Sequence, residues 1–414
     1  MATIAVAARK PTIALHALPP LSLYVHIPWC VRKCPYCDFN SHEARGELPE
    51  QEYVQALITD LEQALPSIWG RRVHSIFFGG GTPSLLSAAA LDRTLAAIRA
   101  RVALDAYAEI TLEANPGTFE ANKFAAFRQL GINRLSIGIQ SFSARHLKRL
   151  GRIHDDVEAR RAVEMARAIF DNVNLDLMYG LPDQSLLEAE ADLATALAFQ
   201  PAHISAYHLT IEPNTYFYKH PPVVPDDAVS ADMQVSLENL LAEHGYRHYE
   251  TSAFAVPGSE ARHNLNYWQF GDYLGIGAGA HSKLSFPDRI ERQMRWKQPR
   301  QYMAKTAAGQ AIQEQHLVLP DEVAFEFMMN ALRLIDGFPS HLFEERTGLA
   351  LVRVQRELDE AEQRGLLTRT HRDIIPTLRG QRFLNDLLEL FLPDSGDDAS
   401  QIKNASQIKI ANGK

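Results

Sequence analysis

The chain has 414 residues, which is too long for one small domain and indicates two domains or one large barrel with an additional module. Apolar residues make up 46% and charged residues 22%, as in an ordinary folded protein with a core of normal size. The formal charge of −8 excludes a global basic field for nucleic acid or an anionic membrane, and the absence of an 18-residue apolar run excludes a predicted spanning helix.

Apolar runs alternate with helical patterns from residue 21 to about residue 210. Each predicted strand is short, and a segment with helical spacing follows it. The predicted strands cover residues 23–27, 73–78, 108–112, 133–139, 173–178 and 203–209. Six strands separated by helices favour parallel β-α-β units with right-handed crossovers, and therefore an α/β fold with a full or partial barrel.

The pattern changes after residue 290. Residues 322–334, 351–364 and 380–392 have helical spacing, and residues 365–367 and 373–375 predict a small hairpin, so this part resembles a winged-helix module. The acidic helix at 351–364 would repel phosphate, and no nucleic-acid partner is expected. The predicted division is therefore a flexible extension (1–20), a barrel with the cofactor sites (21–290), a C-terminal helical domain (291–392) and a disordered polar tail (393–414).

The strongest chemical signal is Cys30-Val-Arg-Lys-Cys34-Pro-Tyr-Cys37, which contains all three cysteines of the chain. An odd number of cysteines within eight residues does not suit disulfides and indicates a reducing compartment such as the cytoplasm. Three thiolates from one loop can bind three irons of a [4Fe–4S] cluster and leave the fourth iron for the amino and carboxylate groups of S-adenosylmethionine (SAM). One alternative is a zinc site that borrows His26 or His42, although zinc loops usually contain C-x2-C pairs. The other is three unrelated buried cysteines.

Polar and special residues collect where the predicted strands end. The turn Gly79-Gly80-Gly81-Thr82-Pro83 follows the second strand, Glu113, Gln140 and Asp176 close the next three, and Arg152 lies shortly after. Active sites of parallel barrels lie on the loops at this end of the strands. Each residue alone could be a helix cap, a tight turn or a solvated charge. Their shared position predicts one site, with carboxylates for ribose hydroxyls and an arginine for the SAM carboxylate.

Two further segments contain distinctive patterns. His263-Asn-Leu-Asn-Tyr-Trp268 places a histidine among aromatic residues, where it is more often a core residue but could ligate a heme. Gly275, Gly277 and Gly279 alternate and lack the spacing of a dinucleotide loop, so they predict a strand and a tight loop near the mouth of the barrel.

These segments together resemble a known family. Tyr24-Val-His-Ile-Pro28-Trp-Cys30, the three-cysteine loop, the glycine turn and Asn174-Leu-Asp-Leu-Met-Tyr-Gly-Leu-Pro182 are similar to the branch of the radical SAM superfamily that contains oxygen-independent coproporphyrinogen III dehydrogenase. The resemblance covers about residues 20–392. Within that branch the chain resembles the heme chaperones, because Phe39 stands where the dehydrogenases have a further cysteine, because the His263 segment is characteristic of the chaperones, and because the N-terminal extension is short.

The resemblance implies a partial (β/α)6 radical SAM barrel with a C-terminal helical domain. It implies that Cys30, Cys34 and Cys37 are the cluster ligands, and that His263 contacts heme. It also implies a SAM pocket lined by Tyr24, Gly80, Gly81, Thr82, Glu113, Gln140, Arg152 and Asp176.

The function that this resemblance implies is a heme chaperone. It would bind heme, a [4Fe–4S] cluster and SAM, and deliver heme to respiratory hemoproteins, with a homodimer left open. The alternative is an enzyme of porphyrin biosynthesis, the coproporphyrinogen III dehydrogenase itself, since a pure carrier has no evident need of an intact SAM pocket. The sequence assigns no catalytic residue and does not decide whether SAM is cleaved.

Overall fold

A computed structural model describes residues 13–118 and 121–393, and a 12-stranded sheet dominates it. Six parallel strands form the central part of this sheet, in the order in which they occur along the chain. Most of their residues are buried, as expected for strands covered on both faces. The six strands are β1 (Leu21–Ile27), β4 (Arg72–Gly80), β5 (Ala103–Ala114), β6 (Arg134–Gln140), β7 (Asn172–Tyr179) and β8 (His203–His208).

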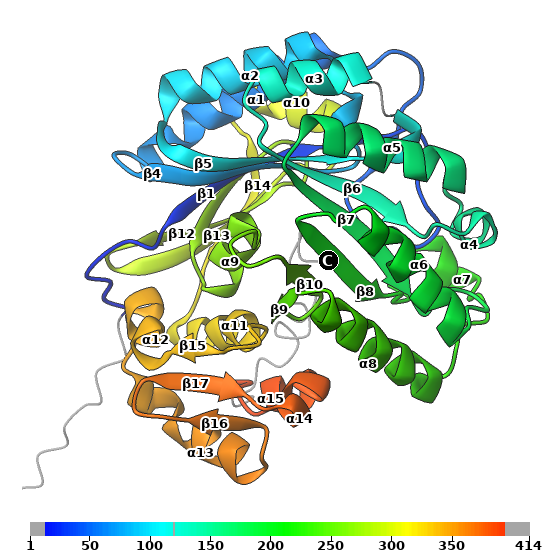
Figure 1. The fold of residues 1–414 in the computed structure, drawn as a ribbon. Coiled ribbons are helices and arrows are strands. Elements are labelled where there is room, and N and C mark those ends of the chain that lie inside the picture. Colours follow the sequence, from blue (N-terminus) through cyan, green and yellow to red (C-terminus); the bar gives the residue numbers. More distant parts are fainter. Residues whose placement is uncertain (1–12, 119–120, 394–414) are drawn as a thin grey trace, which may run out of the picture.

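Helices connect these strands and cover the outer face of the sheet (Figure 1). Two of them begin with a capping box, in which Asp155 and Ser185 exchange hydrogen bonds with Glu158 and Glu188, respectively. The crossover helices are α1 (Glu50–Ala64), α2 (Ala88–Arg101), α3 (Ala121–Gln129), α4 (Ala144–Arg149), α5 (Asp156–Ile169), α6 (Leu186–Ala198) and α8 (Asp227–Glu243). The predicted α/β fold with six parallel strands is thus confirmed.

The sheet continues beyond the six strands on both sides. The added strands are β11 (Asp272–Ile276), β12 (His281–Phe286), β13 (Arg289–Arg295) and β14 (Ile312–Leu317) beside β1, and β10 (Ala253–Ala255) and β9 (Arg247–Glu250) beside β8. The sheet ends in β14 and β9 and does not close, so the barrel is partial. The sheet extends past residue 290, where a domain boundary was expected. The sequence pattern changes there because the strands that follow are antiparallel. The division into domains remains an expectation.

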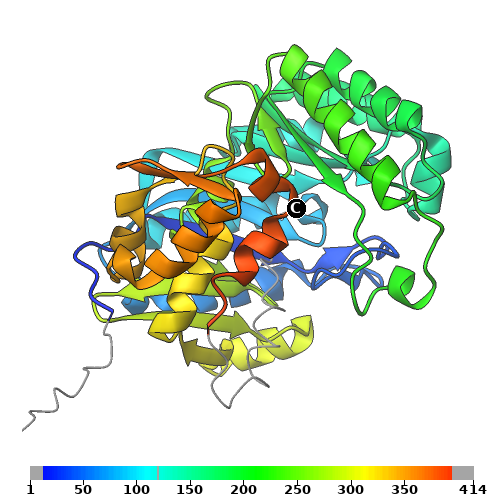
Figure 2. The same ribbon diagram turned by 90° about the horizontal axis from the view of Figure 1, so that it is seen from below.

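The C-terminal part folds around a separate hydrophobic core. A three-stranded sheet lies among its helices, as in a winged-helix module, and confirms the predicted class of this domain. Its elements are α11 (Pro320–Ala331), β15 (Phe338–Pro339), α12 (Ser340–Thr347), α13 (Gln355–Gln363), β16 (Leu367–Arg369), β17 (Asp373–Pro376), α14 (Leu378–Arg382) and α15 (Leu384–Glu389). In Figures 1 and 2 this module lies against the open side of the barrel, opposite the outer helices.

Part of the predicted N-terminal extension is packed against the C-terminal domain. Ile13 and Leu15, from the predicted N-terminal extension, are buried in the C-terminal core. The expected flexibility of residues 1–12 and disorder of residues 394–414 lie outside the described residues. Within the described ranges, the structure has no helix of the length and apolarity that a membrane crossing requires.

Candidate cofactor-binding site

The cysteine loop (residues 30–37) follows β1 and lies between the short parallel strands β2 (Trp29–Cys30) and β3 (His42–Glu43). All three cysteines are free thiols. Just after the loop, the side-chain amide of Asn40 donates hydrogen bonds to the backbone carbonyls of Ala278 and Lys297, both at 2.9 Å. The loop predicted from the alternating glycines therefore does reach the mouth of the barrel, where it anchors the segment that follows the cysteines.

Each cysteine sulfur has a different polar neighbour. Thr82 Oγ1 lies 3.5 Å from Cys30 Sγ, Ser41 Oγ lies 3.7 Å from Cys37 Sγ, and Arg152 Nη1 lies 3.6 Å from Cys34 Sγ. Burial raises the pKa of the Cys30 thiol to about 11 and also raises the pKa of Cys37. These thiols are therefore protonated at neutral pH, and metal binding would have to release their protons.

The thiol geometry bears on the choice between a cluster and zinc. In residues 13–118 and 121–393 no three His, Cys, Asp or Glu side chains converge on one metal-sized point. His26 uses both ring nitrogens, at 3.1 Å from the Tyr24 hydroxyl and 2.9 Å from the Asn40 carbonyl oxygen. His26 is thus unavailable as a zinc ligand, whereas His42 Nε2 is buried without a hydrogen-bond partner, so the zinc alternative through His42 stays open. Three thiols along one loop that faces a large cavity fit a cubane cluster.

The turn at residues 79–83 needs glycine at two positions, because a side chain there would clash with neighbouring atoms. Gly80 has φ of +112°, and a Cβ there would lie 2.5 Å from the His26 ring. A Cβ on Gly81 would lie 2.5 Å from the Trp29 carbonyl oxygen, because the Gly81 and Thr82 amides donate to the Ile27 and Trp29 carbonyls, respectively. Glycine thus lets the end of β4 approach the strand that leads into the cysteine loop. The Gly80 amide also donates to Glu113 Oε2 at 3.2 Å.

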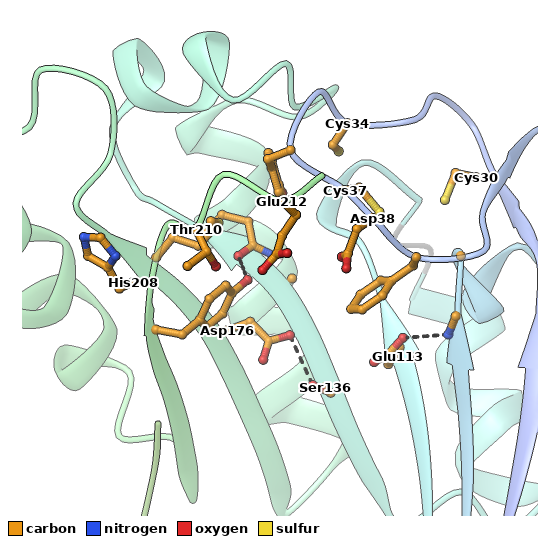
Figure 3. Close-up of a pocket in the computed structure, with 18 of the residues that line it drawn as sticks. Cys30, Cys34, Cys37, Asp38, Glu113, Ser136, Asp176, His208, Thr210 and Glu212 are labelled. Atoms are coloured by element: carbon orange, nitrogen blue, oxygen red, sulfur yellow. Dashed lines mark hydrogen bonds between the residues drawn. The ribbon is translucent and has the colours of Figure 1, made fainter. Parts of the chain in front are cut away.

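The predicted polar side chains at the strand ends do meet at one cavity (Figure 3). Asp176 on β7 accepts hydrogen bonds from Asn174 at 3.0 Å and Ser136 at 3.4 Å, which fix its carboxylate. Gln140 at the end of β6 adopts φ of +69°, and the Tyr207 hydroxyl donates to its side-chain oxygen. Such a backbone conformation is uncommon outside glycine and is held by the surrounding contacts.

Arg152 connects the barrel to the cysteine loop. Its Nη2 donates to the Gly138 carbonyl at 2.6 Å and to the Asn115 side chain, while Nη1 faces the Cys34 sulfur. These contacts hold the guanidinium at the end of β6. A positive charge in this position favours negatively charged groups beside the cysteines.

The cavity has a volume of about 920 Å³. Ten predicted site residues line it: Cys30, Cys34, Cys37, Gly80, Gly81, Thr82, Glu113, Gln140, Arg152 and Asp176. Sequence reasoning missed a further set of lining residues, among them Asp38, Asn115, Ser136, Tyr207, Thr210, Glu212, Phe325, Met329, Arg333 and Leu388. Ser136 could have been found from strand alternation, since it lies four residues before Gln140 on the same face. The residues after 320 gave no local signal.

Tyr24 and His263 are not among the lining residues. His263 lies on α9 (Arg262–Trp268) and is 1% exposed. Its ring stacks on that of Phe77, with ring centroids 4.8 Å apart. Tyr24, 2% exposed, packs against the same two rings. Burial lowers the pKa of His263 to about 3, which keeps its imidazole neutral. The predictions that Tyr24 contacts SAM and His263 contacts heme stay predictions, and neither residue lines the cavity in this structure.

Comparisons with known proteins agree with this fold and site. The family model of the radical SAM superfamily matches residues 24–196, and that of the HemN C-terminal domain matches residues 318–383. The solved structure of coproporphyrinogen III oxidase (HemN) from Escherichia coli covers 90% of this chain and 90% of its own chain, with a TM-score of 0.77 and 24% sequence identity. The fold and the cysteine site thus define a radical SAM protein with a HemN-type C-terminal domain.

Two curated relatives narrow the family. The chain is 52% identical to the heme chaperone HemW of Escherichia coli over 379 residues, covering 91% of this chain and 99% of the relative. It is 48% identical to the heme chaperone HemW of Haemophilus influenzae, with the same coverage. The chain belongs to the HemW family. Membership implies a [4Fe–4S] cluster and SAM as cofactors of the barrel.

Proposed function

We propose that this protein is a heme chaperone that holds a [4Fe–4S] cluster and SAM and delivers heme to respiratory hemoproteins. The observation that carries the proposal is a single cavity whose lining includes the three cysteines on one side and apolar C-terminal side chains on the other. One compartment can thus receive a cluster, SAM and a large apolar ligand. The names of the full-length relatives support heme as that ligand.

In this proposal Cys30, Cys34 and Cys37 ligate the cluster. When bound, the cluster would chelate SAM through its open iron and supply the electron that cleaves the sulfonium. Eight residues are proposed for SAM: Tyr24, Gly80, Gly81, Thr82, Glu113, Gln140, Arg152 and Asp176. Glu113 and Asp176 offer carboxylate oxygens for hydroxyl and amino groups, and Arg152 offers a positive charge beside the cysteines. His263 is proposed as a heme contact. The free thiols support the cytoplasm as the compartment.

The test begins with anaerobic reconstitution with iron and sulfide, followed by heme titration of the loaded protein. We expect visible cluster absorption with about four irons per chain and a Soret change on adding heme. Zinc in place of iron, or no Soret change in wild type, would contradict the proposal. Transfer to an acceptor is tested separately, by mixing the heme-loaded protein with an apo-form respiratory hemoprotein and following the acceptor's spectrum.

His263→Ala tests the heme contact. A matched control is His248→Ala, since His248 also stacks on a phenylalanine, Phe254, with ring centroids 4.2 Å apart, but lies on β9 at the edge of the sheet. Loss of heme binding in the His263 variant alone would support the assignment. Equal binding by both variants and wild type would remove it.

The second candidate function is the coproporphyrinogen III dehydrogenase reaction. The observation in its favour is the set of ordered polar side chains, such as Asp176 and Gln140, around the cavity. Phe39, in the position of a further cysteine in the dehydrogenases, argues against it. An anaerobic assay with reductant, SAM and coproporphyrinogen distinguishes the two functions. Formation of protoporphyrinogen would support the dehydrogenase reaction in place of the chaperone function.

A further inference from the structure

The C-terminal domain contributes one wall of the cavity. Most of the side chains in that wall are apolar: Phe325, Met329, Leu388 and Leu392. Arg333, two residues after the end of α11, lies among them with Asn385 and Glu389 and is the one cation of this wall in the described residues. A cation beside apolar side chains is costly unless an anion pairs with it, so the contacts of this arginine decide whether it can bind an anionic ligand.

The Arg333 side chain is held in place but not neutralised. Its Nε donates to the Met329 carbonyl at 3.3 Å, and its guanidinium carbon lies 5.2 Å from the centre of the buried Trp268 ring. In the part of the chain that the structure describes, its two terminal nitrogens have no hydrogen-bond acceptor and no carboxylate within 4.0 Å. These donors are free for a ligand.

The acidic residues nearby do not replace that ligand. Glu250 interacts with Arg333 at longer range, and burial raises the pKa of this carboxyl to about 7, so it is partly neutral at physiological pH. Glu389 and Glu212 share the cavity but form no ion pair with Arg333. The terminal nitrogens of Arg333 therefore keep no direct carboxylate partner in the described residues, and they lie beside apolar surface.

We propose that Arg333 anchors a carboxylate of the tetrapyrrole, with its terminal N–H groups paired to the carboxylate oxygens and the ligand's apolar face against Met329 and Leu388. The guanidinium fork matches a carboxylate in two parallel hydrogen bonds. Apolar side chains around an arginine without a direct ion pair suit a flat apolar ligand with an acidic arm better than a fully hydrated anion. This inference rests on the proposed chaperone function, because it assigns the ligand of the same cavity.

The test compares hemin with hemin dimethyl ester, in which both propionates are esterified. Both ligands are titrated into wild type, Arg333→Gln and the control Arg379→Gln, with the Soret band as readout. Arg379 is an exposed arginine of the same domain and does not line the cavity. We expect wild type and the control to bind hemin about tenfold or more tightly than the ester, since a charged hydrogen bond contributes roughly 1.5–3 kcal/mol. Arg333→Gln should bind both ligands with the weaker affinity.

The outcomes separate this inference from the proposed function. If wild type binds neither ligand, the chaperone proposal itself fails. If wild type binds hemin and the ester equally, or if Arg333→Gln binds hemin like wild type, the function stands and the Arg333 assignment is overturned. Equal binding of both ligands by wild type overturns the assignment without any variant, whereas a preference for hemin is assigned to Arg333 only by its variants, because Arg32 and Arg152 also line the cavity. Arg333→Lys, which keeps charge but not the fork, should give intermediate hemin affinity.

Discussion

A buried ion pair supports the cysteine loop from behind. Asp60 on α1 and Arg295 on β13 each have side chains 1% exposed, with Arg295 Nε 3.1 Å from Asp60 Oδ1. The other carboxylate oxygen accepts from Tyr302 Oη at 2.9 Å and the Gly277 amide at 3.2 Å. Gly277 precedes the carbonyl that anchors Asn40. One carboxylate thus joins the outer helix, the sheet and the loop that touches the cysteine segment.

We predict that Asp60→Asn destabilises the protein by about 3 kcal/mol. Removing one partner of a buried pair costs about 3–5 kcal/mol, because the other charge stays buried without compensation. The lower end applies here, since Arg295 keeps hydrogen bonds to Gln293 at 2.9 Å and Ser282 at 3.2 Å. A loss of about 3 kcal/mol raises the equilibrium constant of unfolding more than a hundredfold.

Urea denaturation of the metal-free protein, followed by far-UV circular dichroism and tryptophan fluorescence, measures this change. Glu62→Gln is the matched control, because Glu62 lies on the same helix and pairs with Arg101 at 2.6 Å on the surface. The control should change the unfolding free energy by less than about 1 kcal/mol. Equal stability of the two variants would refute the argument. Asp60→Asn combined with Arg295→Met should recover part of the loss, since no charge is then buried alone.

Three further predictions concern the loop, its support and the domain contact. Cys34→Ala should abolish the cluster absorption and lower the iron content after reconstitution, while far-UV dichroism stays unchanged; a full cluster in this variant would disprove the ligand assignment. Asn40→Ala loses two hydrogen bonds of 2.9 Å and should release iron to a chelator several-fold faster than wild type, and an unchanged rate would show that those bonds do not hold the loop. Glu250→Gln should stabilise the protein at high pH. Burial raises the pKa of this acid from 4.5 to about 7, so the folded state holds the proton and loses stability as pH rises from about 4.5 to about 7. The gain from Glu250→Gln, measured by urea denaturation, should therefore be about 3 kcal/mol at pH 8 and small at pH 4.5, and the opposite trend would contradict the sign of the shift.

Local sequence determined the six parallel strands and the chemistry at their ends. Strand and helix periods are short-range signals, so five of the six strands could be predicted within two residues of their observed bounds, whereas β5 begins five residues before its predicted start. Because parallel strands place their carboxyl ends at one edge, Glu113, Gln140 and Asp176 could also be assigned to one cavity from the sequence alone. The spacing of Cys30, Cys34 and Cys37 was informative for the same reason, since one loop supplies all three thiols.

Only the tertiary structure decided which residues, distant from one another in the sequence, line the cavity together. Tyr24 and His263 belong to recognisable segments, yet packing turns both rings into the interior beside Phe77, because the direction of a side chain depends on its neighbours across the sheet. No residue near Arg333 in the sequence indicates a role in ligand binding. That role is inferred only from the cavity wall, which is formed by side chains of α11 and α15. The pairing of Asp60 with Arg295 likewise joins residues 235 positions apart, which no local period encodes. Periodicity fixes elements, whereas long-range packing fixes the surroundings of each buried charge.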